Sequence, residues 1–236
     1  MEYHYLLAGL EDLQENQAMS LPYDKLLELM HELMSEKDWQ YIELLQRKSD
    51  DPVILALMED DAVKDRFEET NLSEQDFRTQ LLYEQGMRCK NKFLRDWFAF
   101  NLDMNNVLAA AVCVKHGLDI SKVVVGDSEV ADELRKTTSM SKSNQLAAML
   151  PDLKEIIAVA EISDLMQREK HIDALRWQWI EEHTIFEFFN LEAVLAYYLK
   201  ATILHRWDNL SVEEGEKVFR ALVADMKQGV KLDVAK

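Results

Sequence analysis

Residues 93–114 read FLRDWFAFNLDMNNVLAAAVCV, and this stretch decides the fold class because it is long, apolar and free of Gly and Pro. Its aromatic residues continue an apolar stripe that begins upstream and repeats every four or eight positions, at Phe77, Leu81, Cys89, Phe93 and Trp97. Such spacing is typical of one face of an α-helix. Apart from Gly86, no breaker precedes Asn101, so the pattern predicts one helix from Glu74 to Phe100, about 40 Å long. A second helix is expected from Met104 to His116, with Gly117 as its C-cap.

The segments before and after this stretch also carry apolar residues at helical spacing, separated by helix caps and turn residues. Only 6 Gly and 3 Pro occur in 236 residues, which favours long uninterrupted helices. The run Tyr3–Leu10 fits either a strand or a helix. In the first third of the chain, helices are predicted to start after Ser20-Leu21-Pro22, to cover Trp39–Arg47, to restart at Asp50-Asp51-Pro52, and to start again with Ser73 as N-cap. Further along, a short helix is predicted over Glu129–Lys136, another opens at Pro151, and a turn follows at Thr184. The last predicted elements are a helix from Leu191 to Trp207 and a capping box at Ser211 before an apolar stripe from Val218 to Met226.

These signals predict an all-α protein of packed long antiparallel helices. No Pro-, Gly- or Ser-rich linker divides residues 1–236, so a single domain is expected. The least regular stretch is 118–144, with a polar loop expected over Ser139–Asn144. An alternative is therefore two helical sub-bundles joined by this stretch.

The charge balance restricts the partners. Lys and Arg number 27 against 44 Asp and Glu, a net charge of -17. Such a field repels nucleic acids and anionic lipid. A basic protein surface is the natural partner, although the charge could equally serve solubility alone.

The sequence lacks the motifs that catalysis and cofactor binding require. It contains no Gly-rich phosphate loop, and the two cysteines, Cys89 and Cys113, form no CxxC pair. Glu28 and His31 form one Glu-x-x-His element, whereas a dinuclear metal site in a helical bundle uses two. We therefore expect no enzymatic activity, no cofactor and no metal. One alternative that this absence of motifs leaves open is a helical enzyme with a metal site built from scattered carboxylates.

No export signal or membrane span is expected. The start Met1-Glu2-Tyr3-His4 lacks the basic residues of an export signal, and the longest clean apolar run is Val107–Val114. A bilayer requires about 20 apolar residues. The sequence thus predicts a cytoplasmic protein without direct membrane insertion.

A candidate partner contact lies late in the chain. Lys200, His205 and Arg206 lie close to Trp207 in an otherwise acidic sequence. Lys200 and Trp207 are seven residues apart and should share a helix face, with Arg206 beside it. Because Trp and Arg dominate binding hot spots, Lys200, Arg206 and Trp207 are the candidate contact residues. The alternative is that the basic residues only stabilise a helix C-terminus.

Several segments together resemble a known family. Phe93-Leu94-Arg95-Asp96-Trp97 and Asp103-Met104-Asn105-Asn106-Val107-Leu108-Ala109-Ala110 are similar to the central helices of the C-subunit of the rotary V-type and A-type ATPases, known as the d-subunit in eukaryotes. More specifically, the chain resembles a small bacterial family described as V-type ATP synthase C-subunit-like. Further matching segments, in the same order, are Tyr3–Leu10, Ile172–Trp177 and Ala196–Trp207.

The resemblance implies a fold, a place and a set of partners. It implies packed helical bundles shaped as a funnel or socket. Their place would be a central stalk that links the rotor shaft to the membrane ring and transmits torque in proton or sodium transport. The protein would then be peripheral to the membrane through these partner subunits. The chain is short for a complete C-subunit, which has three similar bundles. The rival hypothesis is a free-standing acidic helical adaptor that binds a basic protein.

The resemblance also singles out three residues as a structural motif, namely Arg95, Asp103 and Asn106. Asp103 and Asn106 should open the second helix of a hairpin. Asp103 can cap free backbone N–H groups there, and Asn106 can bridge to a neighbouring helix. All three are expected to hold structure rather than to perform chemistry.

Overall fold

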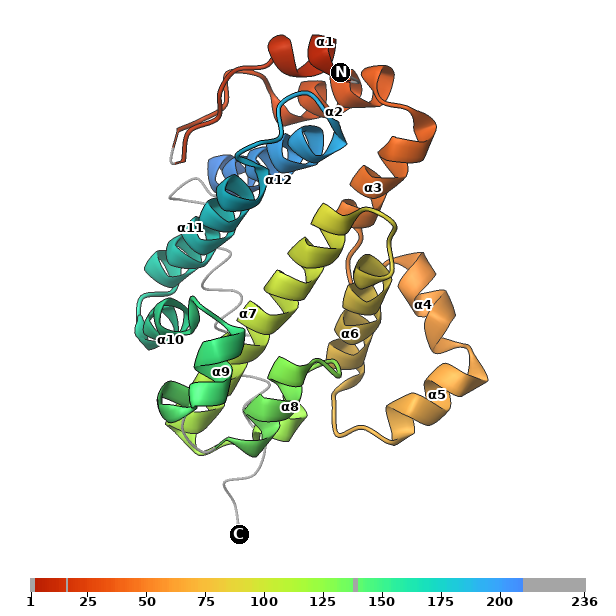
Figure 1. Ribbon diagram of the computed structural model, residues 1–236. Coiled ribbons are helices and arrows are strands. Elements are labelled where there is room, and N and C mark those ends of the chain that lie inside the picture. Colours follow the sequence, from red (N-terminus) through yellow and green to blue (C-terminus); the bar gives the residue numbers. More distant parts are fainter. Residues whose placement is uncertain (1–2, 16, 138–139, 210–236) are drawn as a thin grey trace. The chain divides into compact units, whose positions relative to one another are not determined.

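The computed structural model describes residues 3–15, 17–137 and 140–209, and the regular elements in these ranges are all helices (Figure 1). Helices hold 73% of the described residues, and no strand occurs among them. The predicted all-α fold class is confirmed. The elements are α1 (His4–Ala8), α2 (Tyr23–Leu33), α3 (Glu36–Gln46), α4 (Pro52–Met58), α5 (Asp61–Glu68), α6 (Glu74–Met87), α7 (Lys92–His116), η1 (Ile120–Lys122), α8 (Glu129–Lys136), η2 (Met140–Lys142), α9 (Asn144–Met149), α10 (Leu153–Glu161), α11 (Leu165–Thr184) and α12 (Leu191–Asn209).

The chain divides into two compact units. Unit 1 combines residues 1–35 with 187–236, and unit 2 is the continuous stretch 36–186. The division therefore lies at 35/36 and 186/187, and the irregular stretch 118–144 lies wholly inside unit 2.

Unit 1 joins the two ends of the chain through α1, α2 and α12. Near the N-terminus, the Tyr3 backbone N–H donates to the Phe189 carbonyl at 3.0 Å. Tyr23 at the start of α2 packs on α12, where its ring stacks on His205 with centroids 4.1 Å apart. Its hydroxyl shares a hydrogen bond with Thr202 Oγ1 at 3.0 Å. Residues about 180 positions apart thus pack together in one compact unit.

Unit 2 is built around α7. The two helices with the most extensive contacts to α7 are α6 and α10. Its main core contains Met104, Val107 and Ala110 of α7 with buried residues of α8, α9, α10 and α11. Gly86 lets α6 approach closely, since a Cβ there would lie 2.2 Å from Cγ of Phe98. A smaller satellite core, formed by Ile54, Phe77 and Leu81, holds α4 and α5 against α6.

The predicted single helix over Glu74–Phe100 is wrong, because the chain breaks at residues 88–91. Asn91 caps a new helix there by accepting from the Leu94 N–H at 3.0 Å. Arg95 stabilises the break by donating to the carbonyls of Cys89 and Lys90 at 3.0 and 2.8 Å. The predicted stop at Asn101 is also wrong. Asn101 stays helical and turns its side chain inward, donating to the Trp97 carbonyl.

Several local expectations are confirmed. Ser73 caps α6, Asp51 caps α4 with Pro52 in its first turn, and Gly117 ends α7 with a φ of 65°. The short helix over Glu129–Lys136 has the predicted bounds. Tyr3–Leu10 contains a helix rather than a strand, and the expected loop over Ser139–Asn144 contains the 3-10 turn η2. The predicted capping box at Ser211 and the stripe from Val218 to Met226 lie outside the described residues.

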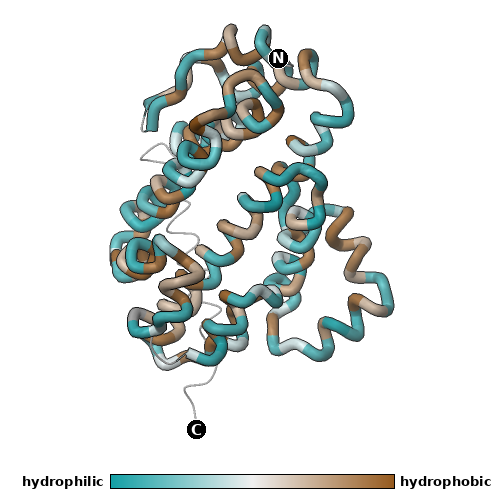
Figure 2. Tube along the Cα trace, viewed as in Figure 1, coloured by the Kyte–Doolittle hydropathy of each residue, from teal (hydrophilic) through white to brown (hydrophobic). Residues whose placement is uncertain are grey.

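One described helix, α7, is long and apolar enough to cross a membrane by length and composition. In this fold, 56% of its most apolar window is buried inside the protein. Polar residues also interrupt the apolar ones along it (Figure 2). The core helices of soluble proteins share these properties, so the feature is weak support for a span.

Candidate functional site

The middle of α7 carries four polar residues that each bind a different part of unit 2, namely Asn101, Asp103, Asn105 and Asn106. They lie within six residues, so their side chains leave the helix in several directions. We call these four residues the α7 hub. Burying polar side chains on a core helix is costly unless each has a partner, and each of these has one.

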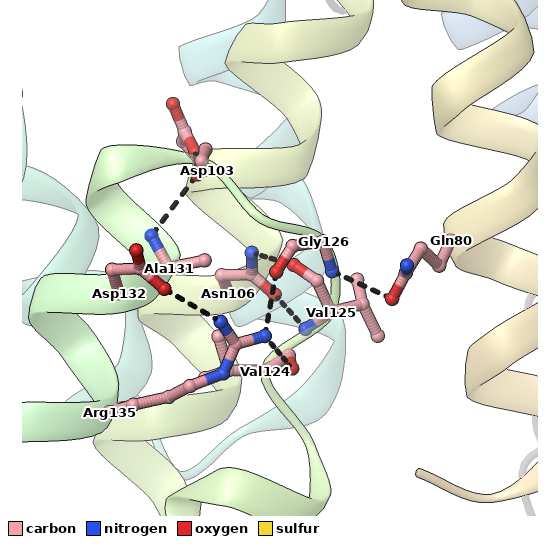
Figure 3. A network of polar contacts seen from close by, with 10 residues as sticks. Gln80, Asp103, Asn106, Val124, Val125, Gly126, Ala131, Asp132 and Arg135 are labelled. Atoms are coloured by element: carbon pink, nitrogen blue, oxygen red, sulfur yellow. Dashed lines mark hydrogen bonds and ion pairs between the residues drawn. The ribbon is translucent and has the colours of Figure 1, made fainter. Parts of the chain in front are cut away.

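Asn106 fixes the segment that follows η1. Its Nδ2 donates to the Val125 carbonyl at 2.8 Å, and its Oδ1 accepts from the Val125 N–H at 2.9 Å (Figure 3). Asn106 is only 1% exposed and Val125 only 7%. The Asn106 side-chain amide therefore satisfies both the N–H and the carbonyl of Val125, as a neighbouring strand would in a β-sheet. It bridges to a loop, whereas the sequence led us to expect a neighbouring helix.

Asp103 binds the chain three residues after Val125, at Ser128. Its Oδ1 accepts from Ser128 Oγ at 3.0 Å, and Ser128 in turn caps α8 by accepting from the Ala131 N–H. Asp103 lies inside α7 rather than at a helix start, so it supports the cap of another helix. Burial raises the pKa of Asp103, and the Ser128 hydrogen bond opposes that rise in part.

Two more side chains hold residues 124–126 from outside α7. Gln80 of α6 accepts from the Gly126 N–H at 3.0 Å. Arg135 of α8 donates to the carbonyls of Val124 and Gly126 at 3.0 and 2.6 Å, as Figure 3 shows. Gly126 has a φ of 81°, a left-handed conformation that favours glycine. This short segment therefore keeps one conformation through side-chain hydrogen bonds.

The remaining hub residues bind α11 and α6. Asn101 Oδ1 accepts from Arg176 Nε at 2.9 Å, and Arg176 also pairs with the buried Asp173 at 3.0 Å. Asn105 donates to the Tyr83 hydroxyl at 2.8 Å. Sequence reasoning missed Gln80, Arg135 and Arg176 as members of this network, because the bonds that place them in it join residues 9 to 75 positions apart, which helical spacing does not link. Arg95, Asp103 and Asn106 all hydrogen-bond to backbone groups or to a helix cap.

Two clefts lie beside the Gln80–Gly126 hydrogen bond. The first has a volume of about 360 Å³, and its lining includes Arg66, Glu69, Phe77, Val124, Asp127 and Arg135. The second, of about 350 Å³, also borders Arg66, Gln80 and Asp127 and extends to Met87 and Leu102. Clefts of this size are in the range that binds small groups or side chains.

The predicted contact residues lie on α12 in unit 1. Lys200 and Trp207 are both partly buried, and helical spacing places them on the side of α12 opposite Tyr198, which faces Tyr23 of α2. Arg206 is exposed, and its guanidinium lies 5.3 Å from the centroid of the Trp207 ring. The three residues are thus near one another along the helix. His205, in contrast, stacks on Tyr23 and belongs to the packing of unit 1.

Metal-ligand clusters and cysteine thiols are two features of the described residues that bear on possible chemistry. No group of three or more His, Cys, Asp or Glu residues is placed to hold a metal ion in the part of the chain that the structure describes. Burial raises the pKa of both the Cys89 and the Cys113 thiols, which makes each a poor nucleophile. The polar groups of the hub are occupied by internal hydrogen bonds.

Comparison with known proteins gives one family. The family model described as "Protein of unknown function (DUF2764)" matches residues 1–81 and 63–230. No curated protein and no solved structure matches the chain. The description of the family names no activity, so a function has to be argued from the residues themselves.

Proposed function

The chain belongs to the DUF2764 family, and we propose that it is a non-catalytic central-stalk subunit of a V-type or A-type rotary ATPase. In this proposal it links the rotor shaft to the membrane ring and transmits torque during proton or sodium transport. It is cytoplasmic, binds the membrane only through its partner subunits, and takes no cofactor.

The observation that carries the proposal is where the resembling residues lie. The two segments most similar to the ATPase stalk protein, Phe93–Trp97 and Asp103–Ala110, both belong to α7. Within them, Arg95, Asp103 and Asn106 make the hydrogen bonds that position the break before α7, the cap of α8 and the segment at Val125. A chance likeness between apolar helices would be expected to involve apolar positions alone. A likeness that includes polar residues with defined partners, of which Asn106 is fully buried, is more specific.

The mechanical properties of unit 2 suit a part that carries load. α7 has 25 residues and is about 37 Å long. Its hub ties it by hydrogen bonds to α6, α11, the Val125 segment and the α8 cap. Helices joined in this way resist sliding, because buried polar groups that lose their partners raise the energy steeply. Torque transmission requires such stiffness and no chemistry.

The second candidate is a free-standing acidic adaptor that binds a basic protein. The distribution of charge favours it. Residues 50–76 contain ten carboxylates and two basic residues, so this short stretch holds a net charge of -8 out of -17. Both candidates require a protein partner, but only the first requires the partner to be an ATPase.

Co-purification separates the two candidates. The full chain is co-expressed with the V-type ATPase subunits encoded in the same genome, and the complex is isolated through a tag on the rotor shaft. We expect the chain in a stoichiometric amount with the stalk, and no saturable ATP binding by the isolated chain in calorimetry. A complete ATPase that forms without the chain would refute the stalk assignment and leave the adaptor.

A further inference from the structure

The part of unit 1 where α1 meets the residues before α12 exposes two aromatic side chains. Tyr5 of α1 is 90% exposed, and Phe188, three residues before α12 begins, is 69% exposed. Ile185 and Phe186, earlier in the same connection, are exposed as well. Single apolar residues are normal on a protein surface, but a group of large ones is a feature of contact sites. Neither Tyr5 nor Phe188 belongs to the core of unit 1, so both are available to another molecule.

Contacts between the two segments hold Tyr5 and Phe188 near each other. The Tyr3 N–H donates to the Phe189 carbonyl at 3.0 Å, and the His4 ring packs on the Phe189 ring with centroids 4.6 Å apart. Tyr5 follows His4 and touches its ring edge-on, with centroids 5.9 Å apart. Phe188 precedes Phe189, so each exposed ring is next in the chain to one member of this contact. The two rings therefore belong to one surface, which we call the aromatic end.

The chain segments around the aromatic end contain no lysine or arginine. Residues 1–24 and 187–199 include seven Asp or Glu residues, five in the first segment and two in the second, but neither segment includes Lys or Arg. One of the seven, Glu187, directly precedes Phe188. A cationic group would therefore meet aromatic rings and carboxylates here, with no Lys or Arg of these segments to repel it.

The nearest basic residues of unit 1 do not cancel this negative field. Lys25 of α2 is already paired with a carboxylate three residues further on, at 2.7 Å. Lys200 is the first basic residue of α12 and lies about 13 Å along the helix from its start. Burial, followed by the charges of Glu11 and Asp12, raises the pKa of Tyr197 of α12 to about 12. The carboxylates of the N-terminal segment thus act on α12 as well.

This combination of exposed rings and negative charge favours one of three possible occupants. Anionic lipid headgroups are repelled by carboxylates. A second copy of the chain would bring the same carboxylates, and a net charge of -17, against the same surface. Arginine and lysine side chains are attracted twice, by the carboxylates through charge and by the faces of Tyr and Phe rings through cation–π interaction.

We infer that the aromatic end of unit 1 binds an arginine-rich segment of a partner protein, with cationic side chains of that segment over the rings of Tyr5 and Phe188. The aliphatic part of each arginine packs on the apolar ring surface, and its guanidinium lies over the ring or toward Glu187. This inference rests on the proposed function in one respect, the need for a protein partner. It assigns the contact surface and the chemistry of the partner.

The test measures binding of a fluorescein-labelled peptide, in which arginine alternates with alanine, to the full chain by fluorescence anisotropy. The salt concentration is about 150 mM, where exposed charges more than about 8 Å apart are largely screened. The site variant is Tyr5→Ser with Phe188→Ser. Its matched control is Leu118→Ser with Met166→Ser, which removes two exposed apolar side chains from unit 2. Both variants keep the net charge, so a difference between them cannot come from the overall field.

We expect the site variant to weaken binding about tenfold and the control to stay within about twofold of wild type. A third variant, Tyr5→Phe with Phe188→Tyr, keeps both rings and should bind like wild type. Every variant should keep the circular dichroism spectrum of the wild type, because the replaced side chains are exposed. Equal binding by the site variant and the control would overturn the inference. A ring-keeping variant that loses as much binding as the site variant would also do so, because the rings would then not be the cause.

The other two occupants are tested with the same proteins. Sedimentation with vesicles of phosphatidylcholine and phosphatidylserine should leave the wild-type chain in solution, and analytical ultracentrifugation should show no dimer that depends on Tyr5 and Phe188. Vesicle binding that the site variant loses would assign the aromatic end to a membrane, and a dimer that it loses would assign the surface to a second copy. Either result would overturn the inference.

The outcome is separate from that of the stalk assignment. The peptide assay contains no ATPase subunit, so it can fail while co-purification with the ATPase succeeds; the inference then fails and the function stands. If the site variant loses the peptide but the ATPase forms without the chain, the aromatic end serves a different basic partner.

Discussion

Replacing Asn106 by alanine tests whether the α7 hub is structural. The substitution removes a donor and an acceptor, leaving the N–H and the carbonyl of Val125 buried without partners. An unsatisfied buried polar group costs about 1–3 kcal/mol. Two such groups should therefore lower the free energy of unfolding by about 2–6 kcal/mol. That loss is a large part of the about 5–15 kcal/mol that stabilises a typical domain.

The matched control is Asn105→Ala, one position earlier on the same helix. Asn105 is only partly buried and makes one hydrogen bond, to the Tyr83 hydroxyl, which water can replace. We expect that loss to be about 0.5–1.5 kcal/mol. Urea unfolding followed by circular dichroism measures both variants, and hydrogen exchange at the Val125 amide reports the local effect. If the two variants differ by less than about 0.5 kcal/mol and Val125 exchange is unchanged, the reasoning on the hub is refuted.

Three further predictions concern packing, pH dependence and partner contact. Gly86→Ala should lower the melting temperature, because the added Cβ would overlap the Phe98 ring. Overpacking costs about 1–3 kcal/mol, which exceeds the about 0.5–1 kcal/mol that alanine gains in helix propensity. The control Gly9→Ala, whose Cβ would meet nothing nearer than 3.5 Å, should be neutral or stabilising, and a larger loss at Gly9 than at Gly86 would contradict the packing. Burial raises the pKa of Asp103 above its ordinary value of 3.8, so the folded protein favours the protonated carboxyl. The stability that this preference contributes is complete below pH 3.8 and is lost as the pH rises through the higher pKa of the folded state. Asp103→Asn keeps an acceptor for Ser128 and should therefore be more stable than wild type in urea at pH 7, with a smaller difference near pH 4; lower stability at pH 7 would exclude this explanation. Trp207→Ala should lower the free energy of unfolding by less than the about 3–5 kcal/mol expected for a core tryptophan. Both Trp207→Ala and Arg206→Ala should reduce co-purification with ATPase subunits. Large stability losses in both variants, or unchanged assembly in both, would leave Trp207 and Arg206 a structural role only.

The sequence by itself determined the fold class and several helix ends, although it did not predict α5, α9 or the break between α10 and α11. Apolar spacing, few breakers and local caps such as Ser73, Asp51 and Gly117 act over four or five residues, so they can be read directly from the chain. The sequence failed at residues 88–91, because Asn91 as a cap and Arg95 as its support resemble ordinary polar residues of a helix surface. It also failed at Asn101, where the partner that keeps the side chain buried is Arg176 in α11.

Only the tertiary structure decided which polar residues act together. Asn106 and Val125 are 19 positions apart, and Gln80 and Gly126 are 46 apart, so no local pattern links them. The same holds for the cleft, which Glu69 and Asp127 both line because α5, α6 and residues 121–127 converge. The net charge could be counted from the sequence, but which carboxylates lack a cation depends on the folded positions of Arg66 and Arg135. A hydrogen bond or ion pair requires atoms about 3 Å apart, and between distant residues only packing of the whole unit sets that distance.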